Sequence, residues 1–323
     1  MMSPLTNTTG GLQYQGLLES VAFSMLTTVP CCVFLLVNAA MLLTLRSRPL
    51  FRETPRYVLL LNLLCADTAQ MALSQLLYLL AASRAPLTYP ACGVLVMLAD
   101  LTNAVSPLTL VAMSLERYVA VCRPLRHAAL VTPRSTMAAV AAVWAFSSLN
   151  VLTQVVLLLD FPFQDLQSLR MDDFCSKGRV MLGAASEVYD RGYTCFLFVS
   201  TSVAVASSYV AVTMAARSAS SGGASARRAR DTLLLHLVQV GLSLSSTVYS
   251  PVLMALSRSV NRLLFVRLQN VLYVAIFIFP RCLSSLIYGL RDKSIQPVLL
   301  QHLSCGLKLP IGTSPPSPRD VDV

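Results

Sequence analysis

Charged residues are scarce in this chain: they make up 12% of its 323 residues, while 55% are hydrophobic. Soluble globular domains carry about 25% charged residues, so this composition excludes an ordinary water-soluble enzyme or binding domain. The chain also has only three histidines and no Cys-x-x-Cys, Gly-x-Ser-x-Gly or His-Glu-x-x-His sequence. These absences argue against a zinc site and against a hydrolase, so we expect no metal, no cofactor and no enzymatic activity.

The chain is rich in long apolar stretches. Seven of them are each long enough to cross a bilayer as a helix, and crossing takes about 20 residues. No alternating strand pattern supports a barrel, and helices satisfy their own backbone groups in hydrocarbon. The predicted spans are residues 21–45, 57–82, 93–119, 135–159, 193–216, 232–256 and 265–290. We therefore expect an all-α membrane protein, a seven-transmembrane helix bundle.

The distribution of basic residues sets the expected orientation. At or after the ends of spans one, three, five and seven there are four Lys or Arg each, whereas the opposite loops hold seven in total. Cytoplasmic segments carry the excess, so the N-terminus should lie outside and the C-terminus in the cytoplasm. The formal charge of +10 is then a topology signal and an attraction to anionic membrane lipid, and it requires no nucleic-acid partner.

This topology divides the chain into four parts. They are an extracellular N-terminus at 1–20, the bundle at 21–290, a juxtamembrane amphipathic segment at 291–309 and a disordered cytoplasmic tail at 310–323. Residues 1–20 contain no Lys or Arg, unlike the basic start of a cleaved signal peptide. A glycosylation sequon begins at Asn7, on the side that the topology places outside. We see no internal repeat, which disfavours a transporter.

The inner end of the third span carries the most informative motif. Residues 113–127 read MSLERYVAVCRPLRH, with Glu116, Arg117 and Tyr118 at the centre. This stretch resembles the acid-Arg-Tyr motif of rhodopsin-like G-protein-coupled receptors, in the form typical of their olfactory branch. Further landmarks occur in the family's order, and the overall pattern is most similar to odorant receptors of fishes. These landmarks are Asn38, Leu63 to Asp67, Cys92, Trp144, Ser208-Tyr209, His236-Leu237 and Tyr288 to Lys293.

The resemblance implies that a small-molecule odorant binds in the outer half of the bundle, where spans three, five, six and seven converge. The candidate ligand-binding residues are Asp100, Asn103, Ala104, Tyr193, Leu197, Tyr249, Val252, Leu253, Asn270 and Tyr273. Asp100 suits a cationic or polar odorant. It lies one position beyond the aspartate of amine receptors, where this chain has Ala99, so an amine ligand does not follow from the resemblance.

The resemblance also implies a heterotrimeric G protein of the olfactory type as the inner partner, with cyclic AMP as its output. The candidate coupling residues are Glu116, Arg117, Tyr118, Tyr209, Asp231 and Tyr288. Arg117 is expected to pair with an acid at rest, either Glu116 or Asp231, and to be released when span six moves. An interpretation in which Asp231 only caps the start of span six remains open.

A buried ion pair is the third implication. Alignment by family position puts Asp67 and Arg281 near mid-membrane, beside Ser106, in a pocket where related receptors often hold sodium on the span-two carboxylate. Because an unpaired buried charge costs several kcal/mol, we expect Arg281 to pair with Asp67 and replace the sodium ion. Cys92 and Cys175 lie on the oxidising side, and their expected disulfide would hold the long outer loop over the bundle.

One departure from the family leaves coupling open. The Asn-Pro-x-x-Tyr sequence of span seven is here Ser284-Ser285-Leu286-Ile287-Tyr288, and the missing proline removes a natural helix kink. We expect a multi-pass receptor in the plasma membrane. Two alternatives remain: a rhodopsin-like receptor for a non-odorant ligand, and a transporter or channel.

The orientation yields the first testable prediction. An epitope tag at the C-terminus should bind antibody only after cells are permeabilised, whereas a tag at the N-terminus should bind on intact cells, because basic segments stay in the cytoplasm. Immunofluorescence of the two tagged chains, side by side, measures this. Staining of the C-terminal tag on intact cells would overturn the orientation.

Overall fold

The computed structural model describes residues 6–83, 85, 87–159, 175, 177–181, 183–219, 237–238, 241–246, 249–291 and 294–307. The longer helices in this part are α1 (Thr6–Ser47), α3 (Pro55–Ala82), α4 (Tyr89–Cys122), α6 (Pro133–Leu159), α8 (Ala184–Ala219), α10 (Tyr249–Ser259), α11 (Arg262–Leu272), α12 (Phe279–Arg291) and α13 (Gln296–Leu307). Short helices are α2 (Pro49–Glu53), α5 (Pro124–Leu130) and α7 (Lys177–Val180), and a π-helical stretch, η2 (Tyr273–Ile278), joins α11 to α12.

Six helical segments in the described part are long and apolar enough to cross a membrane. They are Val21–Ser47, Pro55–Ala82, Tyr89–Cys122, Pro133–Leu159, Ala184–Ala215 and Arg267–Ile287. Each overlaps one of the predicted spans. The remaining prediction, 232–256, lies partly outside the described residues, and its described pieces at 237–238, 241–246 and the start of α10 are helical.

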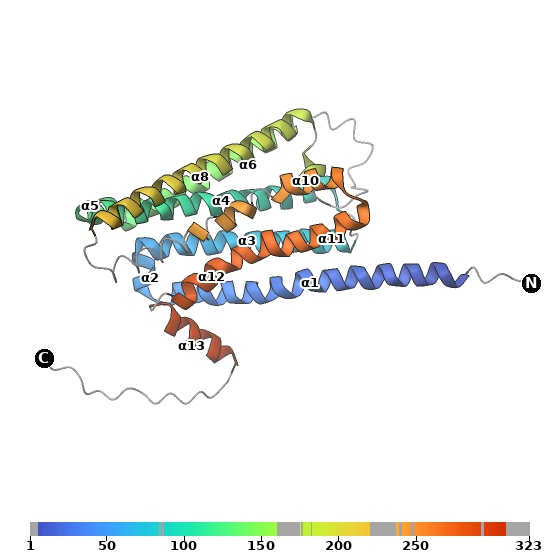
Figure 1. Cartoon of the computed structure of the whole chain (residues 1–323), viewed down its shortest axis with the longest axis horizontal. Coiled ribbons are helices and arrows are strands. Elements are labelled where there is room, and N and C mark those ends of the chain that lie inside the picture. Colours follow the sequence, from blue (N-terminus) through green and yellow to red (C-terminus); the bar gives the residue numbers. More distant parts are fainter. Residues whose placement is uncertain are drawn as a thin grey trace, which may run out of the picture.

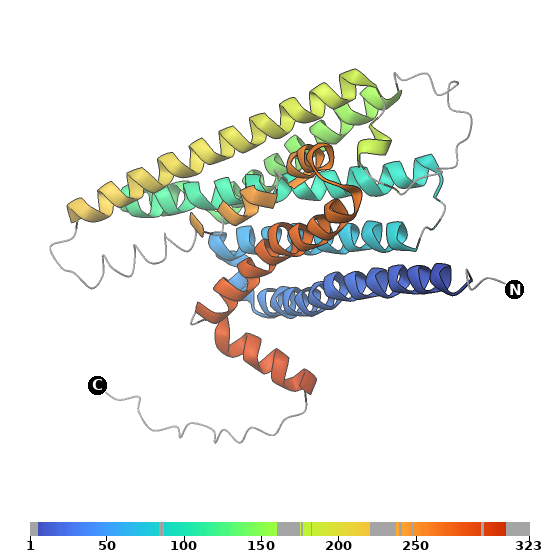
Figure 2. The same cartoon turned by 45° about the vertical axis from the view of Figure 1, so that its right-hand side comes forward.

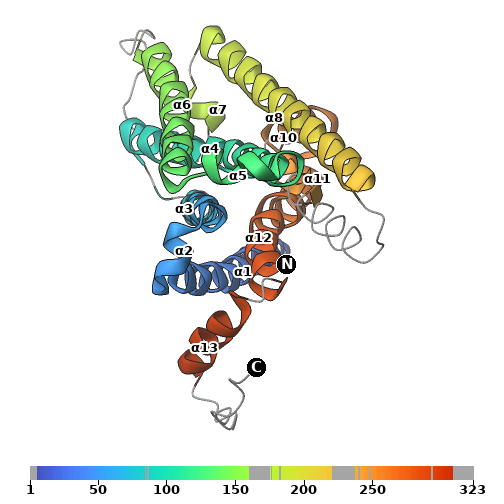
Figure 3. The ribbon, with the colours of Figure 1, turned by 90° about the vertical axis from the view of Figure 1, so that its left-hand side faces the viewer.

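Helix α4 is the central helix of the bundle. It packs against α3, α6 and α8, and the view along the bundle shows it between them (Figure 3). In the most apolar stretch of α4, 56% of the residues are buried, against 17% for α6. The long helices run side by side, and α13 turns away from the end of α12 (Figures 1 and 2). We call the end of the bundle near Cys92 the disulfide end, and the opposite end of α4 the Arg117 end.

The outward faces of the long helices are apolar. Leu36, Leu149 and Val203, for example, are each more than half exposed, at 71%, 59% and 62%. Polar side chains are instead buried, among them Asn38, Gln70 and Gln154. This distribution is the reverse of that in a water-soluble protein, and it fits a bundle whose outer surface meets lipid.

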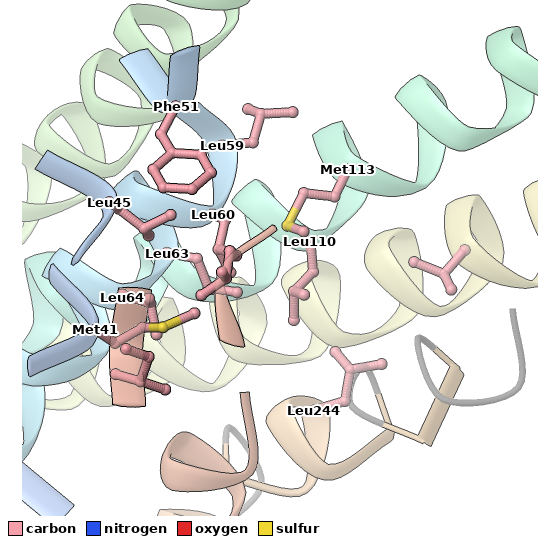
Figure 4. Packing of buried hydrophobic residues seen from close by; sticks show 13 residues of the cluster. Met41, Leu45, Phe51, Leu59, Leu60, Leu63, Leu64, Leu110, Met113 and Leu244 are labelled. Carbon is pink, nitrogen blue, oxygen red and sulfur yellow. The ribbon is translucent and has the colours of Figure 1, made fainter. Parts of the chain in front are cut away.

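The largest apolar cluster fills the Arg117 half of the bundle. Figure 4 shows its side chains converging from α1, α2, α3 and α4. Its buried members are Met41, Leu45, Phe51, Leu59, Leu60, Leu63, Leu64, Leu110, Met113, Val205, Leu244, Ile295 and Leu299. Ile295 and Leu299 bring the start of α13 into this core, which explains why α13 begins close against the bundle.

Several helices begin earlier than predicted: α1 begins at Thr6 and α4 at Tyr89, where the spans were expected from residues 21 and 93. Helix α8 begins at Ala184, whereas the span was expected to begin at residue 193. The charged residues Glu187, Asp190 and Arg191 interrupt the apolar run but not the helix, so a reading based on hydrophobicity starts too late. In span seven, the missing proline of the family motif was expected to remove a helix kink. The span nevertheless contains an irregularity, the π-helical turn η2, just before Pro280. The ring nitrogen of Pro280 cannot donate a hydrogen bond to the carbonyl four residues earlier.

A polar triad ties the neighbouring helices α3, α4 and α6 together. The Trp144 indole on α6 donates to the Asn62 side-chain oxygen on α3 at 2.8 Å, and the Asn62 amide donates to the Thr109 hydroxyl on α4 at 2.9 Å. The Thr109 hydroxyl donates in turn to the carbonyl of Val105. Each polar group is thereby satisfied without water.

We predict that Asn62→Leu destabilises the bundle, because it leaves the Trp144 N–H without its acceptor at a cost of about 1–3 kcal/mol. The measurement is the unfolding temperature of the purified protein in detergent. Ser207→Ala is the control, since the Ser207 hydroxyl bonds only to a carbonyl of its own helix on an exposed face. Equal unfolding temperatures for the two variants would show that the triad contributes nothing.

Candidate functional site

A buried ion pair occupies the middle of the bundle. The Arg281 Nη1 of α12 lies 2.9 Å from the Asp67 Oδ1 of α3, and both side chains are 3–4% exposed. The same carboxylate oxygen accepts a hydrogen bond from the Ser106 hydroxyl of α4 at 2.7 Å. The three residues that sequence reasoning grouped together therefore meet in one place.

Arg281 reaches two further partners. Its Nη2 donates to the Asn103 side-chain oxygen of α4 at 2.7 Å and to the Ser246 hydroxyl at 3.4 Å. Its guanidinium lies over the Phe277 ring, 4.7 Å from the ring centre. A single side chain thus links α3, α4, the helical residues 241–246 and its own helix, and any relative movement of these elements has to break or rebuild its contacts.

A polar pocket opens at the disulfide end. It has a volume of about 30 Å³ and receives side chains from α4, α6, α7 and α8. Its lining residues are Asp100, Asn103, Ala104, Asn150, Gln154, Lys177, Asp190, Tyr193, Thr194 and Leu197. Within each long helix these residues lie three or four positions from the first of them or from one another, apart from two adjacent pairs, so each helix turns one face to the pocket.

Lys177 bridges two acids in this pocket. Its Nζ lies 2.5 Å from the Asp100 Oδ2 of α4 and 2.5 Å from the Asp190 Oδ1 of α8. Burial of the Lys177 ammonium disfavours its charge, but the two carboxylates outweigh this effect and raise the pKa of Lys177 above its ordinary value. Lys177 is therefore a permanent cation between two acids at neutral pH.

The disulfide positions this lysine. Cys92 near the start of α4 is bonded to Cys175, with their Cα atoms 5.6 Å apart, which confirms the expected pairing. Lys177 follows Cys175 by two residues and begins α7. The Tyr89 hydroxyl donates to the carbonyl of Val180 at the other end of α7, so this short helix is fastened to α4 at both ends.

A second, smaller hollow lies at the Arg117 end. It is lined by Ser114, Arg117, Val205, Ser208, Tyr209, Val212 and Leu237. The Arg117 Nε lies 3.5 Å from the Glu116 Oε2, and the His127 Nε2 of α5 lies 3.8 Å from the other Glu116 oxygen. Of the predicted coupling residues, Arg117 and Tyr209 thus share a hollow, and Glu116 is the acid beside Arg117.

The remaining predicted ligand-binding residues do not line the pocket at the disulfide end. Tyr249 and Tyr273 pack with Phe277 in an aromatic cluster, and Asn270 accepts a hydrogen bond from Tyr78 on α3 at 3.2 Å. Val252 is 41% exposed and Leu253 is half-buried on the same helix. Spans three and five contribute to the pocket as expected, through α4 and α8, and α6 and α7 add residues that were not expected. Spans six and seven were expected to contribute as well, but much of span six lies outside the described residues.

Several predicted sites cannot be placed. Asp231 lies outside the described residues, as do the side chains of Asn7 and Tyr288, although Asn7 and Tyr288 belong to α1 and α12. Tyr118 is half-buried near the end of α4. In the described part of the chain, no group of three or more His, Cys, Asp or Glu side chains could hold a metal ion.

Sequence reasoning missed five pocket residues: Asn150, Gln154, Lys177, Asp190 and Thr194. Asn150 and Gln154 could have been predicted from the sequence. Two polar residues four positions apart in an apolar span share one helix face, and exposing that face to lipid would cost free energy, so it should point into the bundle. Lys177 could not have been predicted in this way, since only the fold brings this loop residue between Asp100 and Asp190.

Comparison with known proteins identifies relatives across most of the chain. The family described as 7 transmembrane receptor (rhodopsin family) matches residues 37–288. Odorant receptor 131-2 of Danio rerio is 32% identical over 277 residues, which is 85% of this chain and 84% of that protein. Olfactory receptor 4K15 of Homo sapiens is 28% identical over 85% of this chain and 83% of its own length, and Olfactory receptor 2T34 of Homo sapiens is 25% identical over 87% and 89%.

We predict that Arg281→Met destabilises the protein by about 3–5 kcal/mol, because it leaves the Asp67 carboxylate buried without its partner. Asp67→Asn in the same chain should restore much of the loss, since it removes the orphaned charge. The measurements are the unfolding temperature in detergent and the fraction of protein at the cell surface. Arg134→Met, at an exposed position near the start of α6, is the control. If the Arg281→Met single variant is as stable as the original chain, the ion pair has no structural role.

Proposed function

Since the chain belongs to the rhodopsin family of seven-transmembrane receptors, within its odorant-receptor branch, we propose that it binds a small odorant at the disulfide end and activates a heterotrimeric G protein at the Arg117 end. The disulfide end faces the outside in this proposal and the Arg117 end faces the cytoplasm, in keeping with the excess of basic residues at the latter. The receptor resides in the plasma membrane, and its G protein is of the type that raises cyclic AMP.

The observation that carries this proposal is the arrangement along α4. One helix lines a polar pocket with Asp100, Asn103 and Ala104 near one end and a hollow with Ser114 and Arg117 near the other. Asn103 lines the pocket and also accepts a hydrogen bond from Arg281. A ligand that shifts Asn103 therefore acts directly on the ion pair in the middle of the bundle.

Arg281 takes the place of a sodium ion in this proposal. Its guanidinium supplies the positive charge next to Asp67 that a bound cation would otherwise supply. Because the charge belongs to the chain, the receptor's response does not depend on sodium concentration. The Arg281 network is instead part of the resting state and rearranges when the helices move.

The switch at the inner end is the pairing of Arg117. Glu116 contacts it in the structure, and Asp231 at the start of span six is a second resting partner in our proposal. Release of Arg117 exposes the hollow that Tyr209 and Leu237 line, and the G protein binds there. Breaking an ion pair shifts a two-state equilibrium only by the difference in its energy between the two states, so a few kcal/mol suffices to change basal activity.

The test is a panel of odorants applied to cells that express the receptor and report cyclic AMP. We predict that at least one odorant raises cyclic AMP in cells with the original receptor and that Arg117→Ala removes the response while surface expression stays equal. Cells without the receptor provide the background. A response that survives Arg117→Ala would exclude the proposed switch, and flux of the ligand across receptor liposomes without cyclic AMP would favour a transporter.

A further inference from the structure

The charges of the disulfide-end pocket do not balance. Two carboxylates, Asp100 and Asp190, face one ammonium, Lys177, so the described lining residues carry a net charge of −1. The carboxylate-bearing side chains are 14% and 24% exposed, and Lys177 is 27% exposed. In such partly desolvated surroundings an excess negative charge attracts a cation more strongly than it does in water.

An unused acceptor faces the same pocket. Gln154 is 1% exposed, and within the described part of the chain neither its side-chain oxygen nor its amide nitrogen has a hydrogen-bond partner. A buried acceptor without a donor is costly, so the pocket gains from a ligand that brings N–H groups. Asn150, one turn away on α6, already accepts from Tyr189, so it does not compete for that ligand.

The rest of the lining limits the shape of the ligand. Ala104 and Leu197 are 3% and 4% exposed, and they add apolar surface on the same faces of α4 and α8 that carry the two acids. The pocket has a volume of only about 30 Å³, far below the roughly 300–1,000 Å³ of known ligand pockets, so a ligand fits only where it takes the place of the Lys177 side chain. Such a ligand is small, with a short carbon chain attached to a charged head.

We infer that the odorant of this receptor is a small primary amine, and that Lys177 is a tethered competitor that holds the amine site between Asp100 and Asp190 until the ligand displaces it. The inference rests on the proposed function and adds the ligand class to it. The ligand ammonium takes over the two carboxylates and donates to the Gln154 oxygen, while its carbon chain lies against Ala104 and Leu197.

Displacement of Lys177 also explains how ligand binding changes the contacts of the loop that contains α7. Lys177 links α7 to both α4 and α8 through its two ion pairs. An arriving amine breaks this link between the two long helices and replaces it with a shorter, untethered cation. Because the disulfide and Tyr89 still fasten α7 to α4, the released contact is the one between α7 and α8, and the ligand ammonium now joins α4 to α8 in place of the loop residue.

The test measures binding without signalling. Primary alkylamines of four to eight carbons, with the alcohols, aldehydes and carboxylic acids of the same lengths, are added to the purified full-length receptor, and the rise in its unfolding temperature is recorded over a concentration series. We expect the amines to bind and the matched neutral and acidic compounds to bind more weakly. Asp100→Asn should weaken amine binding by at least roughly 30-fold, because it removes one partner of a buried charge pair.

Removal of the competitor gives the decisive comparison. Lys177→Met should tighten amine binding by about tenfold or more, since the ligand no longer has to displace a close ion pair. Lys177→Met combined with Asp190→Asn keeps the pocket charge at −1, and it should bind amines more tightly than Asp190→Asn alone. Glu187→Gln is the control: it removes an acid one turn from Asp190 that lies outside the pocket and pairs with Arg191, and it should leave binding unchanged.

The outcomes separate this inference from the proposed function. If alcohols, aldehydes or acids bind and activate while amines do not, the ligand class is wrong and the receptor function stands. Amine binding that is weakened or unchanged in both Lys177→Met variants overturns the displacement. If no compound of any class binds the receptor or raises cyclic AMP in cells, the inference and the proposed function both fail.

Discussion

The structure depends on one constraint: polar groups inside a bilayer must find partners in the protein, because the surrounding hydrocarbon offers none. The clearest case is the Arg281–Asp67 ion pair, whose two side chains are almost fully buried. Either charge alone would be too costly at this depth, so the helices that carry them are held at one relative position. Ser106, Asn103 and Ser246 add further hydrogen bonds to the pair and extend the same restraint to the neighbouring helices.

The two polar centres of the bundle are physically continuous. Asn103 lies between them, because its side-chain oxygen accepts from Arg281 while the residue lines the pocket that contains Lys177. Such a shared residue is a contact through which two sites can influence each other, and it requires no long pathway of packed side chains. Asp100 lies three residues before Asn103 on the same face of α4, so the charged head of the pocket and the ion pair are about one helical turn apart along the chain.

The sequence alone allowed the prediction of those features that have a large energetic signature. The long apolar runs are one such feature, and they predicted the membrane spans. The free-energy cost of placing Asp67 and Arg281 in hydrocarbon is another, and it predicted that both side chains point into the bundle. The Lys177 bridge could not, because it joins three segments distant in the chain and depends on how the disulfide folds a loop over the bundle. The early start of α8 was missed for a related reason: Asp190 looked like a loop residue, whereas in the helix it has Lys177 as a partner.

Span seven lacks the proline of the family pattern and is irregular at an earlier position in the same span. Ser285 stands where the family pattern has proline, and its hydroxyl donates to Asn38 on α1, so the position ties two helices together instead of kinking one. The irregularity of the helix lies earlier, in the π-helical turn η2 that precedes Pro280. A π-helical turn widens the helix and changes which side chains face inward. Arg281 follows Pro280 directly, so the residue whose charge organises the centre of the bundle lies within one helical turn of this irregularity.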